Sequence, residues 1–267
     1  MDDLTALRLQ IEWGADEALE EAPVNRVGVV AMTAVATLAP LAPPPPPAPP
    51  ADGLGPLRGP SPQGEGENVL ARALRVALAA TTLEELRAAV AAFDGCGLRD
   101  TASHLVFAEG DPAASLLVIG DPPGADEDRS GMPFAGPQGA YLDRMLGSIG
   151  LERGRLLLAP LIPWRPPGDR PPSAAELAIC MPFVRRLIAL VGPRRLLLLG
   201  PLAARSLLPQ STSRRRLRGA WVDTVEGVPA LPTFGPAELM RSPKDRRAAW
   251  ADLRLLRRTL DADASGG

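Results

Sequence analysis

The chain has 267 residues, of which 46% are hydrophobic and 22% charged, and its formal net charge is −2 at pH 7. This composition provides enough apolar material for a sizeable core and excludes a fibrous or fully disordered protein. Two cysteines, Cys96 and Cys180, and the lack of a secretory leader predict a cytoplasmic protein. The apolar run 29–42 is shorter than a membrane span, so we expect no membrane partner.

The first 66 residues differ in composition from the rest. Apolar and charged residues alternate at helical spacing over 3–20, which predicts a short amphipathic helix within a leader at 1–38. Residues 39–66 are rich in proline and glycine and predict an extended linker, with a spacer favoured over a ligand for SH3-type domains. We expect one globular domain at 67–262 and a disordered tail at 263–267.

The globular part opens with two helices, predicted at 69–79 and 83–92. Thr82 precedes the second helix, and two glutamates lie in its first turn, as is typical of a helix start. Buried strands are then predicted from four apolar runs, at 115–120, 155–162, 195–200 and 228–233.

Helical segments separate these strands, at 139–149, 174–191 and 202–208. The alternation of strands and helices predicts an α/β fold, a three-layer αβα sandwich with a mainly parallel central sheet of about four strands. Ligands bind at the carboxyl ends of the strands in such sheets, so we expect the informative residues in the loops that follow them.

Several short motifs occupy those loops. The first strand is followed by GDPPGADED at 120–128 and GMPFAG at 131–136. Later blocks are RPPGDR at 165–170, LRGAW at 217–221 and TFGPAELMR at 233–241. Taken alone, the first block fits a glycine/proline turn with a solvated acidic face. In this order, the blocks resemble those of the type-4, iron–sulfur-type uracil-DNA glycosylases over residues 90–258.

The resemblance implies a uracil-DNA glycosylase-like fold and a role in base-excision repair. Such an enzyme hydrolyses the N-glycosidic bond of a deoxyuridine that has been flipped out of DNA, and stacking offsets part of the energy of flipping. The implied partner is uracil-containing DNA, single- or double-stranded, and we expect a monomer. The alternative is a catalytically silent DNA-binding relative, because a fold alone does not carry a function.

The resemblance assigns roles to individual residues. Asp121 takes the place of the catalytic acidic residue, which is Glu in the family, and Phe134 takes the place of the ring that stacks on uracil, with a core role as its alternative. Gly120, Gly124 and Gly235 lie at positions that border the substrate.

Two family positions are substituted in a way that predicts reduced activity. Pro160 stands where the family has an Asn that reads uracil, and Gly235 stands where it has a His. Neither residue has a side-chain hydrogen-bond donor. The single histidine of the chain, His104, lies outside the motifs, and we expect it on the surface or in packing.

The family's 4Fe–4S cluster is held by four cysteines, and only two of these positions are cysteine here. Cys96 and Cys180 are retained, whereas Phe93 and Trp164 occupy the other two. Because an aromatic side chain does not ligate iron, we expect no cluster and no metal, and interpret the cysteines as buried free thiols.

Basic residues predict contacts with the DNA backbone. Residues 181–218 contain nine arginines and no acidic residue. Such clusters supply the sequence-independent part of DNA affinity, although a solvated loop is the alternative. An apolar wedge after the last motif could fill the gap left by a flipped base, with a core role for Leu239 or Met240 as the alternative. The residues expected to contact DNA are Arg214, Arg215, Arg216, Arg218, Leu239 and Arg241.

Overall fold

The computed structural model describes residues 68–212 and 218–265. The predicted leader, the linker and the arginines Arg214, Arg215 and Arg216 lie outside the described residues. The last helix, α10 (Arg246–Ser265), continues beyond residue 262, so residues 263–265 of the expected tail are helical. Within the described ranges, no helix combines the length and the apolar character that crossing a membrane requires.

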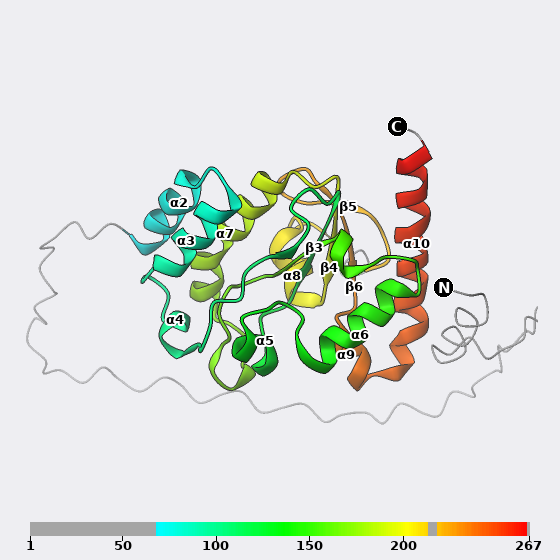
Figure 1. The fold of residues 1–267 in the computed structure, drawn as a ribbon, viewed down its shortest axis with the longest axis horizontal. Coiled ribbons are helices and arrows are strands. Elements are labelled where there is room, and N and C mark those ends of the chain that lie inside the picture. Colours follow the sequence, from blue (N-terminus) through cyan, green and yellow to red (C-terminus); the bar gives the residue numbers. More distant parts are fainter. Residues whose placement is uncertain (1–67, 213–217, 266–267) are drawn as a thin grey trace, which may run out of the picture. The chain divides into compact units, whose positions relative to one another are not determined.

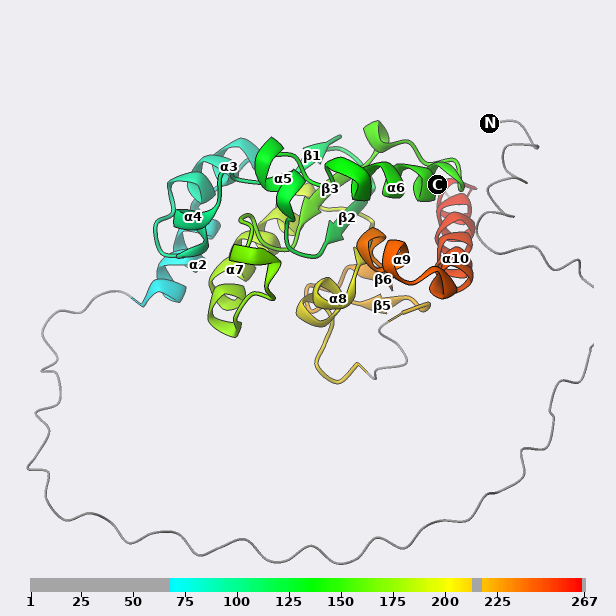
Figure 2. The same ribbon diagram turned by 90° about the horizontal axis from the view of Figure 1, so that it is seen from below.

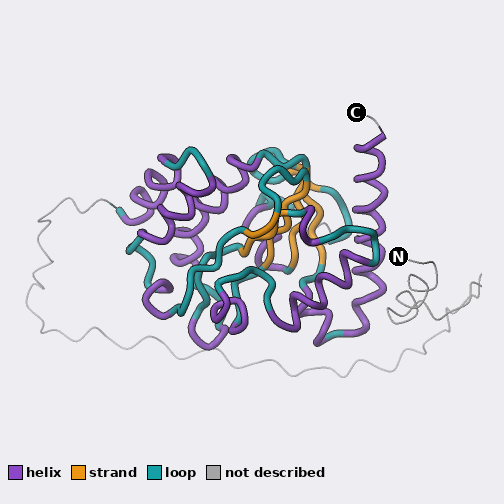
Figure 3. The backbone as a smooth tube through the Cα atoms, in the orientation of Figure 1, coloured by secondary structure: helices purple, strands orange, loops and turns teal. Residues whose placement is uncertain are grey.

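The fold is built on a six-stranded sheet with the order β1-β3-β2-β4-β6-β5. Its four central strands are parallel, as predicted: β2 (Leu116–Gly120), β3 (Leu157–Pro160), β4 (Arg195–Leu199) and β6 (Pro229–Thr233). These strands form the centre of the molecule in Figure 3. Their apolar side chains are buried on both faces, which is why each reads as a continuous apolar run.

Two further strands pair antiparallel at the edges of the sheet. They are β1 (Glu109–Gly110), next to β3, and β5 (Val222–Asp223), next to β6. Neither was predicted, because a two-residue strand is too short to show an alternating pattern.

One face of the sheet is covered by helices from the first and middle parts of the chain. Leu117 and Ile119 of β2 point into this core cluster. The covering helices are α2 (Val69–Ala79), α3 (Leu83–Ala92), α7 (Ala174–Val191) and α8 (Pro201–Leu207), with the short α4 (Leu98–Thr101) beside them. The predictions for α2, α3 and α7 are confirmed, and Thr82 accepts a hydrogen bond from the Glu85 N–H at the start of α3.

The opposite face is covered by α6 (Gly136–Gly147), α9 (Pro236–Arg241) and α10. Leu116 and Val118 of β2 point to this side, so successive residues of one strand supply the two cores. Figure 1 and Figure 2 show these helices across the sheet from α2, α3 and α7. The result is the three-layer αβα sandwich that the sequence predicted.

The carboxyl ends of the parallel strands lie in register. Gly120 at the end of β2 is opposite Pro160 of β3 and Leu199 of β4, and Leu199 is opposite Thr233 of β6. The loops that carry the sequence motifs therefore leave the sheet side by side, at the carboxyl ends of its parallel strands.

Candidate active site

A groove of about 690 Å³ opens at the carboxyl ends of the parallel strands. The loop after β2 lines one part of it, from Asp121 to Glu127, and the block around Pro166 lines another. The starts of α8 and α9 complete the lining, with Arg205 and Arg241 among their residues. Segments that are far apart in the sequence thus share one concave surface, as expected for a ligand site of an open α/β sheet.

Asp121 is the first residue after β2 and is fixed by the first turn of α8. Its Oδ1 accepts hydrogen bonds from the backbone N–H groups of Leu202, at 3.1 Å, and Ala203, at 2.9 Å. Gly200 has a φ of 101°, and a Cβ at this position would overlap the Asp121 carboxylate. A glycine is therefore required here for the backbone conformation and for the close approach of the acid.

Burial raises the pKa of Asp121 to about 6. The hydrogen bond from the Ala203 N–H opposes this shift, and the negative charge of Glu238 adds to it. At neutral pH the group is mainly a carboxylate. It can then stabilise positive charge or orient a water molecule, and it titrates within the range in which enzymes work.

Phe134 packs against the residue that precedes this acid. A methyl group at Gly120 would lie 2.5 Å from Phe134 Cζ, so the ring packs over the last residue of β2. Phe134 has a φ of 52°, in the left-handed region, and is 8% exposed within the core cluster that contains Leu142. The ring is thus a core side chain that lies against the end of β2.

The acidic cluster after Gly124 forms a helix, α5 (Ala125–Ser130), and most of it is not solvated. Glu127 is buried, and its carboxylate accepts a hydrogen bond from the Gly124 N–H at 2.6 Å. Burial raises the pKa of Glu127, and this hydrogen bond opposes the shift. Asp126 pairs with Arg129 near the surface. Of the three acidic residues of α5, Asp126 alone is therefore solvated as the sequence predicted.

The neighbouring acid, Asp128, holds the segment before the first central strand. Its Oδ1 accepts a hydrogen bond from the Ser103 N–H at 2.8 Å, and the His104 ring lies 2.8 Å, through Nδ1, from the Asp128 backbone oxygen. His104 is exposed and contacts the end of α5 through this ring nitrogen, in keeping with the surface or packing role expected for it.

The two substituted family positions lie in different surroundings. Pro160 ends β3, is buried and borders a small apolar cavity together with Val106 and Phe183. Gly235 begins α9, and its N–H donates to Glu238 Oε2 at 2.9 Å. A Cβ at Gly235 would meet its nearest neighbour, the Gly200 backbone, at 3.6 Å, so this position has room for a side chain.

The four positions that align with the family's iron–sulfur ligands are buried together in one hydrophobic core. They are Phe93, Cys96, Trp164 and Cys180. The Phe93 ring packs edge-on to Phe183, with centroids 5.2 Å apart. A hydrogen bond from Cys180 lowers the pKa of Cys96 to about 7, and both cysteines are free thiols. Among the described residues, no three metal-ligating side chains gather together. With two cysteines in the chain, the donor set does not fit a four-cysteine cluster.

Two of the residues expected to contact DNA have structural partners. Arg218 binds the buried Asp252 through Nη1, at 3.0 Å from Oδ2, and its guanidinium lies over the Phe234 ring. Leu239 is fully buried in the core. Met240 is 43% exposed, and it is the apolar side chain of this segment that a partner can reach.

Arg241 is exposed and lines the groove, where its Nε donates to the Ala237 carbonyl of the same helix. Arg205, on α8, is another exposed arginine of the groove and was not singled out from the sequence, and a third, Arg170, pairs with Glu176. Arg205 forms no ion pair with any described residue. Its position shortly after a buried strand was the signal that could have identified it.

Comparison with known proteins agrees with this arrangement. A type-4 uracil-DNA glycosylase of Pyrobaculum aerophilum is 29% identical over 178 residues, which cover 64% of this chain and 91% of that protein. The type-4 uracil-DNA glycosylase of Thermotoga maritima is 30% identical over 148 residues, which cover 55% of this chain and 77% of that protein. The family profile described as the uracil DNA glycosylase superfamily matches residues 107–254, more than half of the chain. The chain therefore belongs to the uracil-DNA glycosylase superfamily.

Proposed function

We propose that the protein is a uracil-DNA glycosylase of base-excision repair with slower base release than its relatives. It hydrolyses the N-glycosidic bond of a deoxyuridine flipped out of single- or double-stranded DNA and leaves an abasic site. The observation that carries this proposal is the Asp121 carboxylate in the groove at the strand ends, with the Phe134 ring packed on the preceding residue, Gly120.

The reaction requires support for two opposite charges. As the bond between C1′ and the base breaks, positive charge develops on the sugar, and the Asp121 carboxylate stabilises it or orients the attacking water. Water then supplies the oxygen at C1′, and the proton that it loses neutralises the departing uracil anion, so that free uracil and an abasic sugar result. Phe134 stacks on the flipped base and offsets part of the energy of unstacking.

The departing base carries the negative charge, and the site offers few hydrogen-bond donors to stabilise it. Pro160 and Gly235 offer no side-chain donor to it. Loss of one donor to a developing anion typically lowers the rate on the order of 10²–10³-fold. We therefore infer slow release of uracil by a monomer that binds no iron–sulfur cluster, since Phe93 and Trp164 do not ligate iron.

Arginines around the groove hold the DNA backbone in this proposal. Arg241 and Arg205 line the groove in the described part of the chain, and Arg214, Arg215 and Arg216 belong to the arginine-rich segment expected from the sequence. Arg218 is not among these DNA contacts, because its guanidinium pairs with Asp252. Phosphate contacts of this kind give affinity without sequence preference.

The missing donors also favour a second candidate, a silent DNA-binding relative. Mass spectrometry of the products separates the two functions. Single- and double-stranded oligonucleotides with one uracil are incubated with the protein, beside matched oligonucleotides with thymine or hypoxanthine. Free uracil with an abasic strand supports the glycosylase. Binding of every oligonucleotide with no released base, at high protein concentration and long times, supports the silent binder.

A further inference from the structure

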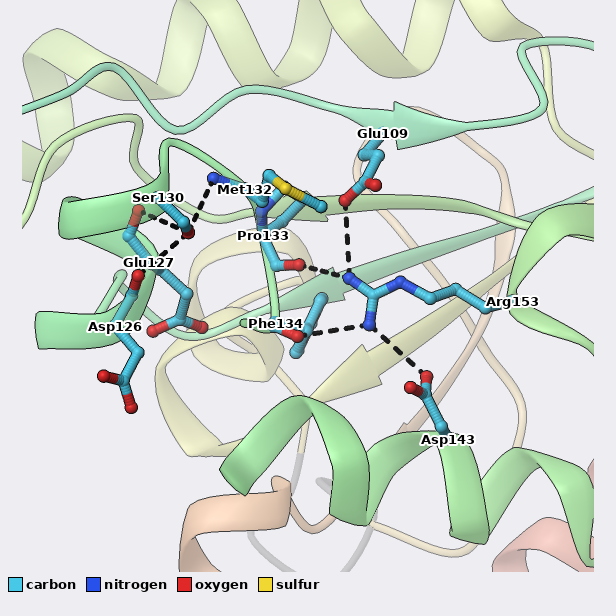
Figure 4. Close-up of polar contacts among 9 residues, drawn as sticks. All are labelled: Glu109, Asp126, Glu127, Ser130, Met132, Pro133, Phe134, Asp143 and Arg153. Atoms are coloured by element: carbon cyan, nitrogen blue, oxygen red, sulfur yellow. Dashed lines mark hydrogen bonds and ion pairs between the residues drawn. The ribbon is translucent and has the colours of Figure 1, made fainter. Parts of the chain in front are cut away.

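Arg153 connects a distant part of the chain to the loop that carries Phe134. It lies in η1 (Arg153–Arg155), the 3₁₀ turn before β3. One guanidinium nitrogen, Nη2, donates to the Pro133 carbonyl at 2.5 Å, and the other, Nη1, donates to the Phe134 carbonyl at 3.1 Å. Figure 4 shows the guanidinium facing these two consecutive carbonyl groups.

Two acids hold the guanidinium in this orientation. Glu109 of β1 lies 3.4 Å from Nη2, and Asp143 of α6 lies 3.3 Å from Nη1. The Arg153 side chain is about three-quarters buried, with 26% exposed. Its fork shape lets it bind two carbonyls and two carboxylates together, which the single point charge of a lysine cannot do.

The loop needs such a support because its backbone is unfavourable. Phe134 has a left-handed φ of 52°, which is rare for a residue with a large side chain. Gly139 of α6 passes so close that a Cβ there would overlap the Phe134 carbonyl oxygen. The backbone of Phe134 is therefore held between α6 and Arg153, and its ring is directed over Gly120.

We propose that Arg153 is a positioning residue that fixes Phe134 for stacking on the flipped base. It acts through the backbone of the loop, because its guanidinium contacts the Pro133 and Phe134 carbonyls. This inference rests on the proposed function for its effect on base release. Its effect on the loop itself does not depend on that function.

The test compares Arg153→Met and Arg153→Lys with Arg155→Met. Arg155 lies in the same turn, is exposed and forms no ion pair with any described residue, so its variant is the matched control. Single-turnover release of uracil should fall roughly 10- to 100-fold in Arg153→Met, the range expected when one base no longer stacks on an aromatic ring. Arg153→Lys should fall less, and Arg155→Met should match the unmodified protein.

A double-variant cycle shows whether the effect passes through the ring. In a Phe134→Leu background, Arg153→Met should cause little further loss, because the two residues act on one stacking interaction. Guanidinium chloride at low millimolar concentration should restore part of the activity of Arg153→Ala, and potassium chloride of equal ionic strength should not. Full additivity of the two substitutions, or equal rescue by both salts, would overturn the proposal.

Hydrogen–deuterium exchange gives a readout that needs no activity. Amides of residues 131–139 should exchange faster in Arg153→Met, with an intermediate rate in Arg153→Lys and no change in Arg155→Met. Unchanged exchange in both Arg153 variants would overturn the inference. If the unmodified protein releases no base, the proposed function fails, and the exchange of this loop alone decides the role of Arg153. Arg153→Lys provides the comparison if Arg153→Met does not fold.

Discussion

The carboxylate of Asp121 accepts a hydrogen bond of 2.9 Å from the backbone N–H of Ala203, which ties the loop after β2 to the first turn of α8. Burial keeps the pKa of this acid at about 6 in spite of the bond. The charge state of the proposed catalytic residue therefore changes just below neutral pH.

This titration predicts a pH dependence of base release. The carboxylate is the form that stabilises a positively charged sugar, so the single-turnover rate should rise as the pH increases through about 6 and level off above it. Asp121→Asn has no titratable group at this position, so its single-turnover rate should be much lower and should not rise with pH. A flat rate between pH 5 and pH 7 in the unmodified protein would show that this acid does not govern the reaction.

A second prediction concerns the stability of the C-terminal layer. Asp252 is 4% exposed and accepts hydrogen bonds from Thr233 Oγ1, at 2.7 Å, and from Arg218. Asp252→Ala should lower the free energy of unfolding by about 3 kcal/mol, because it leaves a buried hydroxyl and a cation without their partner. Urea denaturation measures this change.

Asp263→Ala is the matched control for that substitution. Asp263 lies on the same helix as Asp252, α10, and pairs with Arg195 of β4. Its side chain is 26% exposed, so solvent screens this pair and its loss should cost much less stability. Equal losses in the two variants would contradict a special role for the buried pair.

A third prediction concerns iron. Protein purified without oxygen should be colourless, and chelators should not unfold it, because two of the four aligned positions are aromatic. The double variant Phe93→Cys/Trp164→Cys places four thiols in one buried cluster and should acquire visible absorption after anaerobic reconstitution. A brown unmodified protein with about four irons per chain would contradict this prediction.

A fourth prediction concerns DNA affinity. Replacing Arg205 and Arg241 together with Gln should weaken binding to all sequences alike and reduce the salt slope by about 0.7–0.9 for each phosphate that is no longer neutralised. The control is Arg257→Gln, because Arg257 pairs with Asp261 on α10 and does not line the groove. Substitution of residues 214–216 tests the arginine-rich segment in the same way. An unchanged salt slope would show that the substituted arginines contact solvent and not DNA phosphates.

A fifth prediction concerns the missing donors. Gly235→His has room at the Cβ, so it should raise the rate of base release. Pro160→Asn lies at a buried strand end, and the two substitutions should gain more together than the product of their single effects, since they act on one leaving group. If the double variant stays inactive while DNA binding persists, the silent binder is the better account.

The sequence predicted the parts of the fold that depend on long apolar patterns. The four central strands and α2, α3 and α7 were recognisable because their side chains are buried in regular order. The helix α5 was not, because an acidic segment such as 125–130 shows no apolar period. It forms because Glu127 and Asp128 find backbone N–H partners within the fold.

The site was predictable only where residues form a motif. Asp121 and Phe134 lie in adjoining blocks, and the structure packs the Phe134 ring on Gly120, the residue before Asp121. Arg153 follows Phe134 by 19 residues and lies in no motif, so its contact with the loop became visible only in three dimensions. Likewise, the sequence left open whether Leu239 or Met240 is the core residue, and it did not show that Arg218 pairs with Asp252.

The most direct test of the account compares uracil release by the unmodified protein and by Asp121→Asn under single-turnover conditions, at equal occupancy of a single-stranded oligonucleotide. The account predicts slow release above background by the unmodified protein. Asp121→Asn should be slower by on the order of 10²-fold or more, because it lacks the carboxylate. Equal rates in the two proteins, or no release by either while DNA remains bound, would contradict it.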